Sequence, residues 1–187
     1  MLHMKQNSYK LEIVGQLLNQ NLHLRELSRK LEINPMTLSR KIKGLVEENI
    51  LDFKEEGKNK IYFLKKTSES KANVFMAEQY KLTKTLKKYP SLRNLIDKIQ
   101  ANKEISLSIL FGSYAKGIAK RGSDIDIYIE TPNKKIKQDL EILNSKLNIK
   151  IGKYNKDNLL IREIEKNHVI IKGVELFYER NKFFETA

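Results

Sequence analysis

The chain has 187 residues, which is enough for one medium domain or two small ones and too few for two large cores. It contains no cysteine, which excludes disulfides, thiolate zinc sites and cysteine nucleophiles, and no apolar run approaches the roughly 18 residues of a membrane span. The net charge of +13 favours polyanionic partners, although a lysine-rich proteome would also explain it. Because the N-terminus also lacks the apolar core of a signal peptide, we expect a cytoplasmic protein that does not bind membranes.

Three helices are predicted first. Apolar residues recur on one side of residues 8–19, 24–31 and 35–48 at helical spacing. Asn34 is a good N-cap for the third helix, and Pro35 suits its first position. The second and third helices are therefore joined by a tight turn.

A hairpin and a linker follow. Alternating residues in 50–53 and 60–64 predict two strands, with Gly57 in the turn between them. Residues 67–88 then predict a polar helix, which ends at Tyr89 because the residue before a proline avoids the helical region.

The order helix, helix, turn, helix, hairpin in residues 1–66 resembles a winged helix-turn-helix DNA-binding domain. The resemblance rests on the spacing from Leu24–Leu31 through the Asn34-Pro35 turn to the helix that follows. It implies that this helix enters the major groove of DNA with its N-terminal end first. The residues expected on its exposed side, and therefore at DNA, are Met36, Thr37, Ser39, Arg40 and Lys43. A winged helix used only for protein contacts or dimerisation is the alternative.

The second half of the chain begins with a predicted helix at 91–101. From Ile105 onward the pattern is strand, loop, helix, strand, helix, strand, helix, which indicates an α/β or α+β domain. The expected organisation is a winged helix at 1–66, a helical linker at 67–89 and a second domain at 90–187. The polar stretch Thr67–Ser70 is predicted to be an unpacked break between domains.

A Gly-Ser turn and a pair of aspartates carry the clearest chemical signal. Gly112 lets the backbone approach a phosphate closely, and the hydroxyl of Ser113 can donate to it. A strand is predicted to carry both Asp124 and Asp126, and alternation along it places both carboxylates on one face. Their repulsion favours a cation between them, and Mg²⁺, or Mn²⁺ in its place, suits two carboxylates and substrate phosphates. The pattern predicts a site for a triphosphate and a metal ion.

This segment, with its Phe-Gly-Ser-Tyr-Ala and Ser-Asp-Ile-Asp sequences, resembles the DNA polymerase beta-like nucleotidyltransferase superfamily in its minimal (MNT) form. The resemblance covers roughly residues 90–180, and together with the winged helix it suggests an archaeal-type fusion. It implies an α+β fold in which a small mixed sheet is flanked by helices. It also implies transfer of a nucleoside monophosphate from a nucleoside triphosphate, with ATP the first candidate, to a protein or nucleic-acid acceptor. The implied catalytic residues and metal ligands are Asp124 and Asp126, and the implied nucleotide-binding residues are Gly112, Ser113, Lys116 and Ser123.

One feature of the family is missing. Active members usually carry a third carboxylate on a neighbouring strand, where it helps to bind the metal and activates the attacking hydroxyl. The corresponding strand is expected at 147–151, where Asn148 and Lys150 occupy the alternate positions and neither is an acid. The ammonium group of a lysine there could occupy the metal position. The remaining acids lack the expected context: Glu130, Asp139 and Asp157.

These features support two functions. The first is a nucleotidyltransferase with a protein or RNA acceptor, for example a partner toxin, in which the winged helix guides the enzyme or regulates its own gene. The second is a transcriptional regulator with a catalytically degenerate domain that senses a nucleotide. DNA and a nucleoside triphosphate are partners in both, and a homodimer is left open. His168 is expected to be a structural residue, because no second ligand stands at metal spacing.

Overall fold

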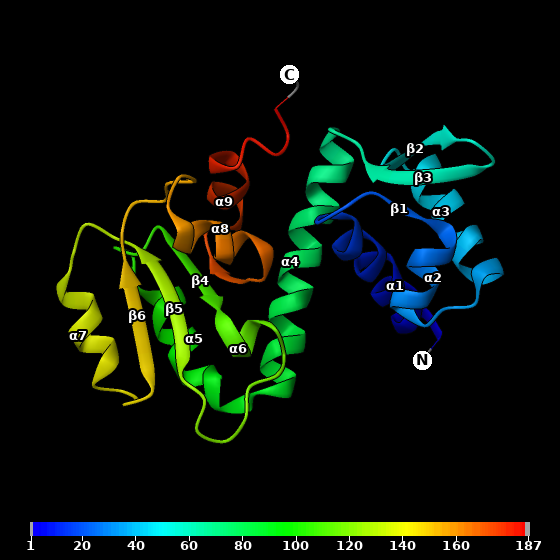
Figure 1. The fold of residues 1–187 in the computed structure, drawn as a ribbon. Helices are drawn as coiled ribbons and strands as arrows, with labels where there is room; N and C mark the ends of the chain where they lie inside the picture. Colours follow the sequence, from blue (N-terminus) through cyan, green and yellow to red (C-terminus); the bar gives the residue numbers. More distant parts are fainter. Residues whose placement is uncertain (1, 186–187) are drawn as a thin grey trace. The chain divides into compact units, whose positions relative to one another are not determined.

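The computed structural model describes residues 2–185, and the side chains of residues 8–185. The chain divides into two compact units (Figure 1). The first comprises the chain up to Ala77 together with Phe184 and Glu185, and the second is Glu78–Phe183. Within the described part of the chain, every helix is too short or too polar to cross a bilayer.

The first unit contains α1 (Leu2–Leu17), α2 (Leu24–Leu31) and α3 (Pro35–Glu47). The ends of α2 and α3 agree closely with the prediction, whereas α1 begins earlier than residue 8. The apolar stripe used for the prediction starts only after that point, and extending an existing helix needs no further nucleation. At the α2–α3 turn, the side chain of Asn34 accepts a hydrogen bond from the backbone N–H of Met36 at 2.9 Å, which confirms the predicted N-cap.

The sheet of the first unit has the order β1-β3-β2, with antiparallel pairing between neighbours. Its strands are β1 (Leu22–His23), β2 (Leu51–Glu56) and β3 (Asn59–Leu64). β2 and β3 extend further than predicted, and the turn between them contains only Gly57, at φ +60°, and Lys58. The charged residues at the ends of these strands suggested a loop, but they are paired in the hairpin, and Glu55 faces the opposite charge of Lys60.

This order of helices and strands is that of a winged helix-turn-helix domain, with the β2–β3 hairpin as the wing. Its core is formed by aliphatic side chains from all three helices and from the sheet. Among the most completely buried side chains of this unit are Ile13, Val14, Leu22, Leu27, Leu38, Ile42, Ile50, Leu51 and Val74.

The predicted break at Thr67–Ser70 is packed rather than loose. The hydroxyl of Thr67 donates to the carbonyl of Asn49 at 2.7 Å and accepts from the backbone N–H of Ser70 at 3.2 Å. Ser70 itself is completely buried. The Thr67 hydroxyl thus caps the start of α4 (Ser68–Lys88). Polar residues are typical of helix N-caps as well as of linkers, so composition alone did not distinguish the two. The division between the two units falls within α4, after Ala77.

The second unit is built on a four-stranded mixed sheet of order β6-β5-β4-β7. The strands are β4 (Leu107–Phe111), β5 (Ile125–Glu130), β6 (Leu147–Ile151) and β7 (Val169–Lys172). β4 pairs antiparallel with both β5 and β7, and β5 pairs parallel with β6. The sequence pattern predicted three strands and missed β7. A short, continuously apolar segment shows neither the helical nor the strand periodicity of apolar residues.

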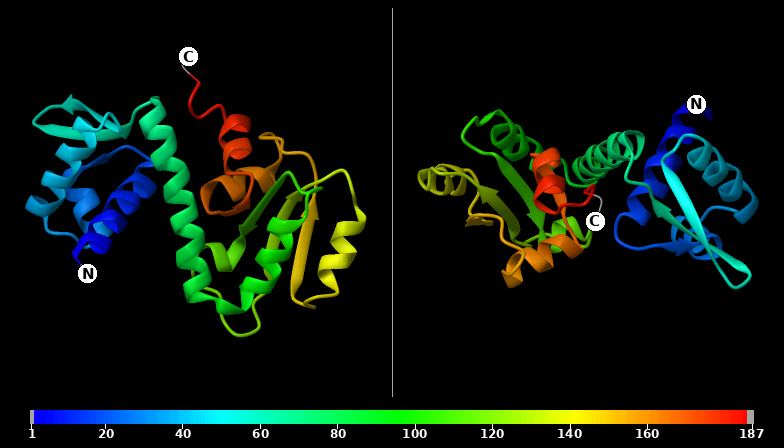
Figure 2. Two further views of the ribbon diagram at one scale, coloured as in Figure 1. Left: turned by 180° about the vertical axis from the view of Figure 1, so that it is seen from behind. Right: turned by 90° about the horizontal axis from the view of Figure 1, so that it is seen from above.

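Helices cover both faces of this sheet (Figure 2). The short η1 (Pro90–Leu92) leads into α5 (Arg93–Ala101), which covers one face together with α7 (Lys135–Glu141). On the other face lie α8 (Leu159–Lys166) and α9 (Val174–Arg180). The fold of the described chain is therefore α+β, as predicted, with a small mixed sheet flanked by helices.

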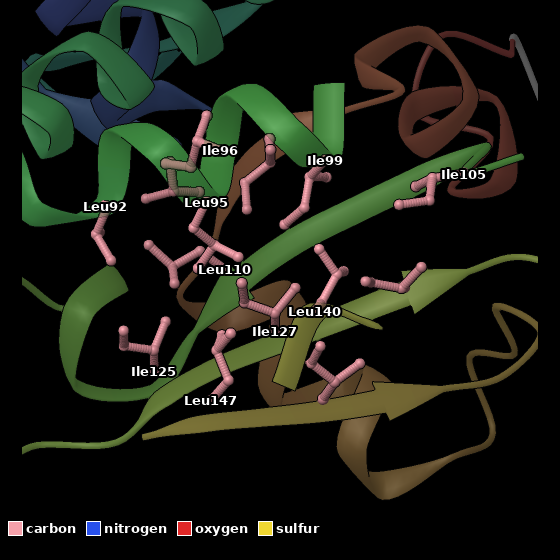
Figure 3. Close-up of a cluster of buried hydrophobic side chains, with 14 of the residues drawn as sticks. Leu92, Leu95, Ile96, Ile99, Ile105, Leu110, Ile125, Ile127, Leu140 and Leu147 are labelled. Atoms are coloured by element: carbon pink, nitrogen blue, oxygen red, sulfur yellow. The ribbon is translucent and has the colours of Figure 1, made fainter. Parts of the chain in front are cut away.

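The main core of the second unit lies between the sheet and the α5–α7 layer (Figure 3). Alternate residues of the strands enter it, while the residues between them point to the α8–α9 face. Asp126 lies between the core residues Ile125 and Ile127, so its side chain points to the α8–α9 face. The core side chains from η1, α5, α7 and the strands include Leu92, Leu95, Ile96, Ile99, Leu110, Ile125, Ile127, Leu140, Leu147 and Ile149.

Candidate nucleotide site

The end of β4 and the start of β5 bring the Gly-Ser turn to the aspartates. Phe111, the last residue of β4, is paired with Asp126, so Gly112 follows directly beside that aspartate. Gly112 has φ +67°, and a Cβ atom on it would lie 2.3 Å from Oδ2 of Asp126. The close approach that the structure shows at Gly112 is to the Asp126 carboxylate. The approach of Gly112 to a phosphate stays a prediction.

The Asp126 side chain is held by a hydrogen bond from the neighbouring strand. Asn148 is paired with Asp126 in the parallel β5–β6 register, and its Nδ2 donates to Oδ1 of Asp126 at 2.7 Å. The Asp126 side chain is half-buried, while Asp124 is exposed and lies one residue before β5 begins. The prediction that one strand carries both aspartates is therefore wrong for Asp124, which lies just before the strand.

The position next to Asp126 on β6 belongs to Asn148 and not to Lys150. Lys150 is paired with Tyr128, further along the sheet, and its side chain is exposed. That the Lys150 ammonium occupies the metal position stays a prediction; the parallel register shows only that Lys150 is not the residue paired with Asp126.

The other acids considered for this role lie elsewhere. Glu130 is paired with Leu107 at the opposite end of β5, and it accepts a hydrogen bond from Arg180 at 3.0 Å. Asp139 is on α7, which packs on the opposite face of the sheet, and Asp157 is exposed just before α8. Across residues 2–185 no three His, Cys, Asp or Glu side chains group as metal ligands would.

The loop between α6 (Gly112–Ala115) and β5 carries the remaining predicted residues. Nζ of Lys116 lies 3.3 Å from Oε1 of Glu163 on α8, so this lysine already has an acidic partner. The hydroxyl of Ser123 accepts from the backbone N–H of Lys120 at 2.9 Å, which closes the loop on itself. The backbone carbonyl of Ser113 accepts from the N–H of Ile118 at 3.0 Å.

Sequence reasoning did not identify the contacts of Asn148 and Glu163. Both residues come from elements that are distant along the chain and become neighbours only through strand order and helix packing. The alternation in residues 147–151 did mark Asn148 and Lys150 as candidates, but the choice between them requires the register of β5 and β6.

A buried polar cluster lies on the α8–α9 side of the second unit. Glu78 is 1% exposed, and its Oε1 accepts from the hydroxyl of Tyr178 at 2.9 Å and lies 3.4 Å from Nε2 of His168. Nδ1 of His168 is 3.0 Å from the carbonyl of Ile164, so the histidine is tied into the core. Burial acts to raise the pKa of Glu78, but contacts with His168, Lys81 and Tyr178 outweigh it and lower that pKa. Burial, with the adjacent Glu78 charge, raises the pKa of Tyr178.

In the winged helix, α3 exposes the residues predicted to meet DNA. Met36 is 70% exposed, and Thr37, Ser39, Arg40 and Lys43 are also exposed. Leu38 and Ile42, which alternate with them at helical spacing, are buried in the core. Lys43 makes an exposed ion pair with Glu47 at 3.8 Å.

Residues 93–182 match the family model described as polymerase beta, nucleotidyltransferase. The second unit thus contains a nucleotidyltransferase-fold domain. Among solved structures, the chain is similar to reduced HlyU from Vibrio cholerae N16961, at 24% identity over 43% of this chain and 98% of that chain, with a TM-score of 0.34. The comparison with curated proteins finds no match.

Proposed function

We propose that the second unit binds a nucleoside triphosphate with a divalent cation and transfers its nucleoside monophosphate to an acceptor. The observation that supports this most directly is the Asp126 carboxylate beside the Gly112 turn, inside the segment that matches the nucleotidyltransferase family. Asp124 and Asp126 are proposed as the cation ligands and catalytic carboxylates. ATP is the first candidate for the nucleotide.

The residues present fit a divalent cation such as Mg²⁺ or Mn²⁺. Asp124 is exposed, and the missing Cβ of Gly112 lets Oδ2 of Asp126 lie directly beside the Gly-Ser turn. Carboxylate oxygens from a protein commonly hold Mg²⁺ together with phosphate oxygens of the substrate. When bound, the cation would neutralise negative charge that otherwise brings a triphosphate and two carboxylates into repulsion.

The phosphate chain is proposed to lie over Gly112 and Ser113, with Lys116 and Ser123 beside it. Lys116 would exchange its ion pair with Glu163 for a phosphate, which is inexpensive because both side chains are well exposed. Ser123 contributes by holding the loop that precedes Asp124, through its bond to Lys120.

A label-transfer experiment tests the reaction. The full-length protein is incubated with each α-labelled nucleoside triphosphate and Mg²⁺ or Mn²⁺, alone and with cell extract. Label from ATP should pass to a protein or RNA acceptor, and Asp126→Asn should abolish the transfer while the circular dichroism spectrum stays unchanged. Asp139→Asn is the matched control, because it makes the same change on the opposite face of the sheet. Nucleotide binding that does not depend on the metal would contradict the proposal.

The first unit is proposed to bind duplex DNA through α3. The exposed row that includes Thr37, Ser39 and Arg40 offers hydroxyl and guanidinium donors for phosphates and base edges. Residues 1–66 contain 13 basic and 8 acidic side chains, a net charge of +5, which supports a polyanionic partner. DNA binding would guide the enzyme to its place of action or would let the protein regulate its own gene.

The second candidate is a nucleotide-sensing transcriptional regulator. The observation that favours it is Asn148, a neutral side chain at the position on β6 adjacent to Asp126. A sensor would bind nucleotide and cation in calorimetry and change its affinity for DNA, yet transfer no label to any acceptor. Label transfer that Asp126→Asn removes would exclude a purely sensing role.

A further inference from the structure

We infer that Asn148 is a positioning residue of the cation site: its side-chain amide holds the Asp126 carboxylate in place and leaves one carboxylate oxygen, Oδ2, for the cation. This inference rests on the proposed function of the Asp124–Asp126 pair as cation ligands. In this inference Asn148 acts through Asp126.

The geometry behind it comes from two neighbouring strands. In the parallel pair β5–β6, Asp126 and Asn148 occupy matched positions, so their side chains leave the sheet on the same face. The 2.7 Å bond from Nδ2 of Asn148 then engages Oδ1 of Asp126, while Oδ2 is the oxygen on the side of Gly112. The two oxygens of one carboxylate therefore have different neighbours.

Such contacts matter because the terminal torsion of an aspartate is soft. The torsion about its Cβ–Cγ bond has broad, roughly two-fold preferences, so the backbone alone does not decide which oxygen points where. A donor on one oxygen selects one orientation. A partner that orients a ligating carboxylate in this way typically accounts for 10–100-fold in metal affinity.

The chemistry of the side chain at position 148 also sets the charge of the site. An amide can donate to Asp126, whereas a carboxylate at the same place would repel it unless a cation lay between the two. With Asn148, the carboxylates proposed for the cation among the described residues are those of Asp124 and Asp126, fewer than three. The phosphates of the nucleotide must supply further oxygens, so cation binding is coupled to nucleotide binding.

The first test removes the positioning contact in the full-length protein. Mn²⁺ binding is measured by electron paramagnetic resonance, with and without a non-hydrolysable α,β-methylene triphosphate. We expect Asn148→Ala to weaken Mn²⁺ binding in the presence of this analogue by about 10–100-fold. Its circular dichroism spectrum should match that of the wild type. Unchanged Mn²⁺ affinity in a folded Asn148→Ala protein would overturn the inference.

The second test changes the charge at the same place and does not depend on the first variant folding. Asn148→Asp should bind Mn²⁺ without nucleotide at least about tenfold more tightly than the wild type, because two adjacent carboxylates favour a cation between them. Asn102→Asp is the matched control, since Asn102 lies at the end of α5 and its Oδ1 accepts from a backbone N–H, which a carboxylate can also do. An equal response of Asn148→Asp and Asn102→Asp would refute the role of position 148. If the wild-type protein binds no Mn²⁺ even with the analogue, the proposed function itself fails. That result differs from failure of the inference about Asn148, in which the wild type binds Mn²⁺ and the variants at position 148 bind it equally well.

Discussion

At the scale of single residues, Gly112 has little tolerance for a side chain. Its φ of +67° is costly for any residue with a Cβ, and that atom would lie 2.3 Å from Oδ2 of Asp126. We expect Gly112→Ala to displace the Asp126 carboxylate and to weaken metal-dependent nucleotide binding by at least about tenfold, because that oxygen is the one proposed for the cation. Calorimetry with the non-hydrolysable triphosphate measures this.

The control for this prediction is Gly117→Ala. Gly117 has nearly the same backbone conformation, at φ +72°, but a Cβ on it would meet only Nζ of Lys88, at 3.7 Å. Both variants should lose about 1–2 kcal/mol of stability from the backbone. Only Gly112→Ala should lose nucleotide binding, and similar losses of binding in both would show that backbone strain, not the contact with Asp126, is responsible.

Glu78 should make the stability of the second unit depend on pH. Its pKa in the folded protein lies below the ordinary value of 4.5, so its contribution is present above that value and is lost as the pH falls through the lower folded-state pKa. We expect Glu78→Gln to reduce the free energy of unfolding by about 1–3 kcal/mol at pH 7. The difference between wild type and variant should shrink below pH 4.5.

Urea denaturation at several pH values, followed by near-ultraviolet circular dichroism, measures this difference. Six of the eight tyrosines lie between Glu78 and Phe183, so the signal reports mainly on the second unit. Glu163→Gln is the control: its ion pairs with Lys116 and Lys166 are exposed, and its effect should stay below about 1 kcal/mol. A difference between wild type and Glu78→Gln that does not vary with pH would contradict the linkage to this carboxyl group.

At the scale of elements, α3 presents one buried and one exposed side. Leu38 and Ile42 anchor it in the core, while Arg40 projects from the other side. If Arg40 reads a guanine, Arg40→Ala should weaken specific binding to DNA from upstream of the gene by about 1–3 kcal/mol in a gel-shift titration. Arg162→Ala removes the same charge from the exposed surface of the second unit and should have a much smaller effect. Absence of any shift at low salt would remove the DNA-binding proposal.

At the scale of the whole molecule, the second unit begins upstream of residue 90, where the sequence pattern placed the start of its domain. The last part of α4 contributes Glu78 to the buried polar cluster, Leu82 to the core and Lys88 to a 2.7 Å bond with the Gly117 carbonyl. A fragment of residues 67–187 should therefore fold and bind nucleotide. A fragment of residues 90–187 should be less stable by more than about 3 kcal/mol, because it lacks a buried leucine and a hydrogen-bonded buried carboxylate.

Limited trypsin digestion provides the first comparison, since cleavage after the exposed Lys66 would yield the longer fragment directly. Urea denaturation of both purified fragments then gives their stabilities. Equal stability of the two fragments would mean that α4 contributes little to the second unit.

Local signals in the sequence determined much of this architecture. The apolar periodicity of α2 and α3, the Asn34 cap with Pro35, and the Gly-Ser turn followed by Asp-Ile-Asp all depend on residues close together in the chain. Such features follow from short-range sterics and hydrogen bonding, so they can be recognised without knowing the fold. The α+β class followed from the order of these elements.

Only the tertiary structure decided what lies beside Asp126. Alternation on β6 allowed either Asn148 or Lys150, and a one-position change in the β5–β6 pairing alters every neighbour across the two strands. The same holds for Glu78, which meets His168 and Tyr178 only after α4, the β7 region and α9 have packed together. Parallel strands are joined by long crossovers, so their register is set by the packing of the whole core and not by any residue near the turn.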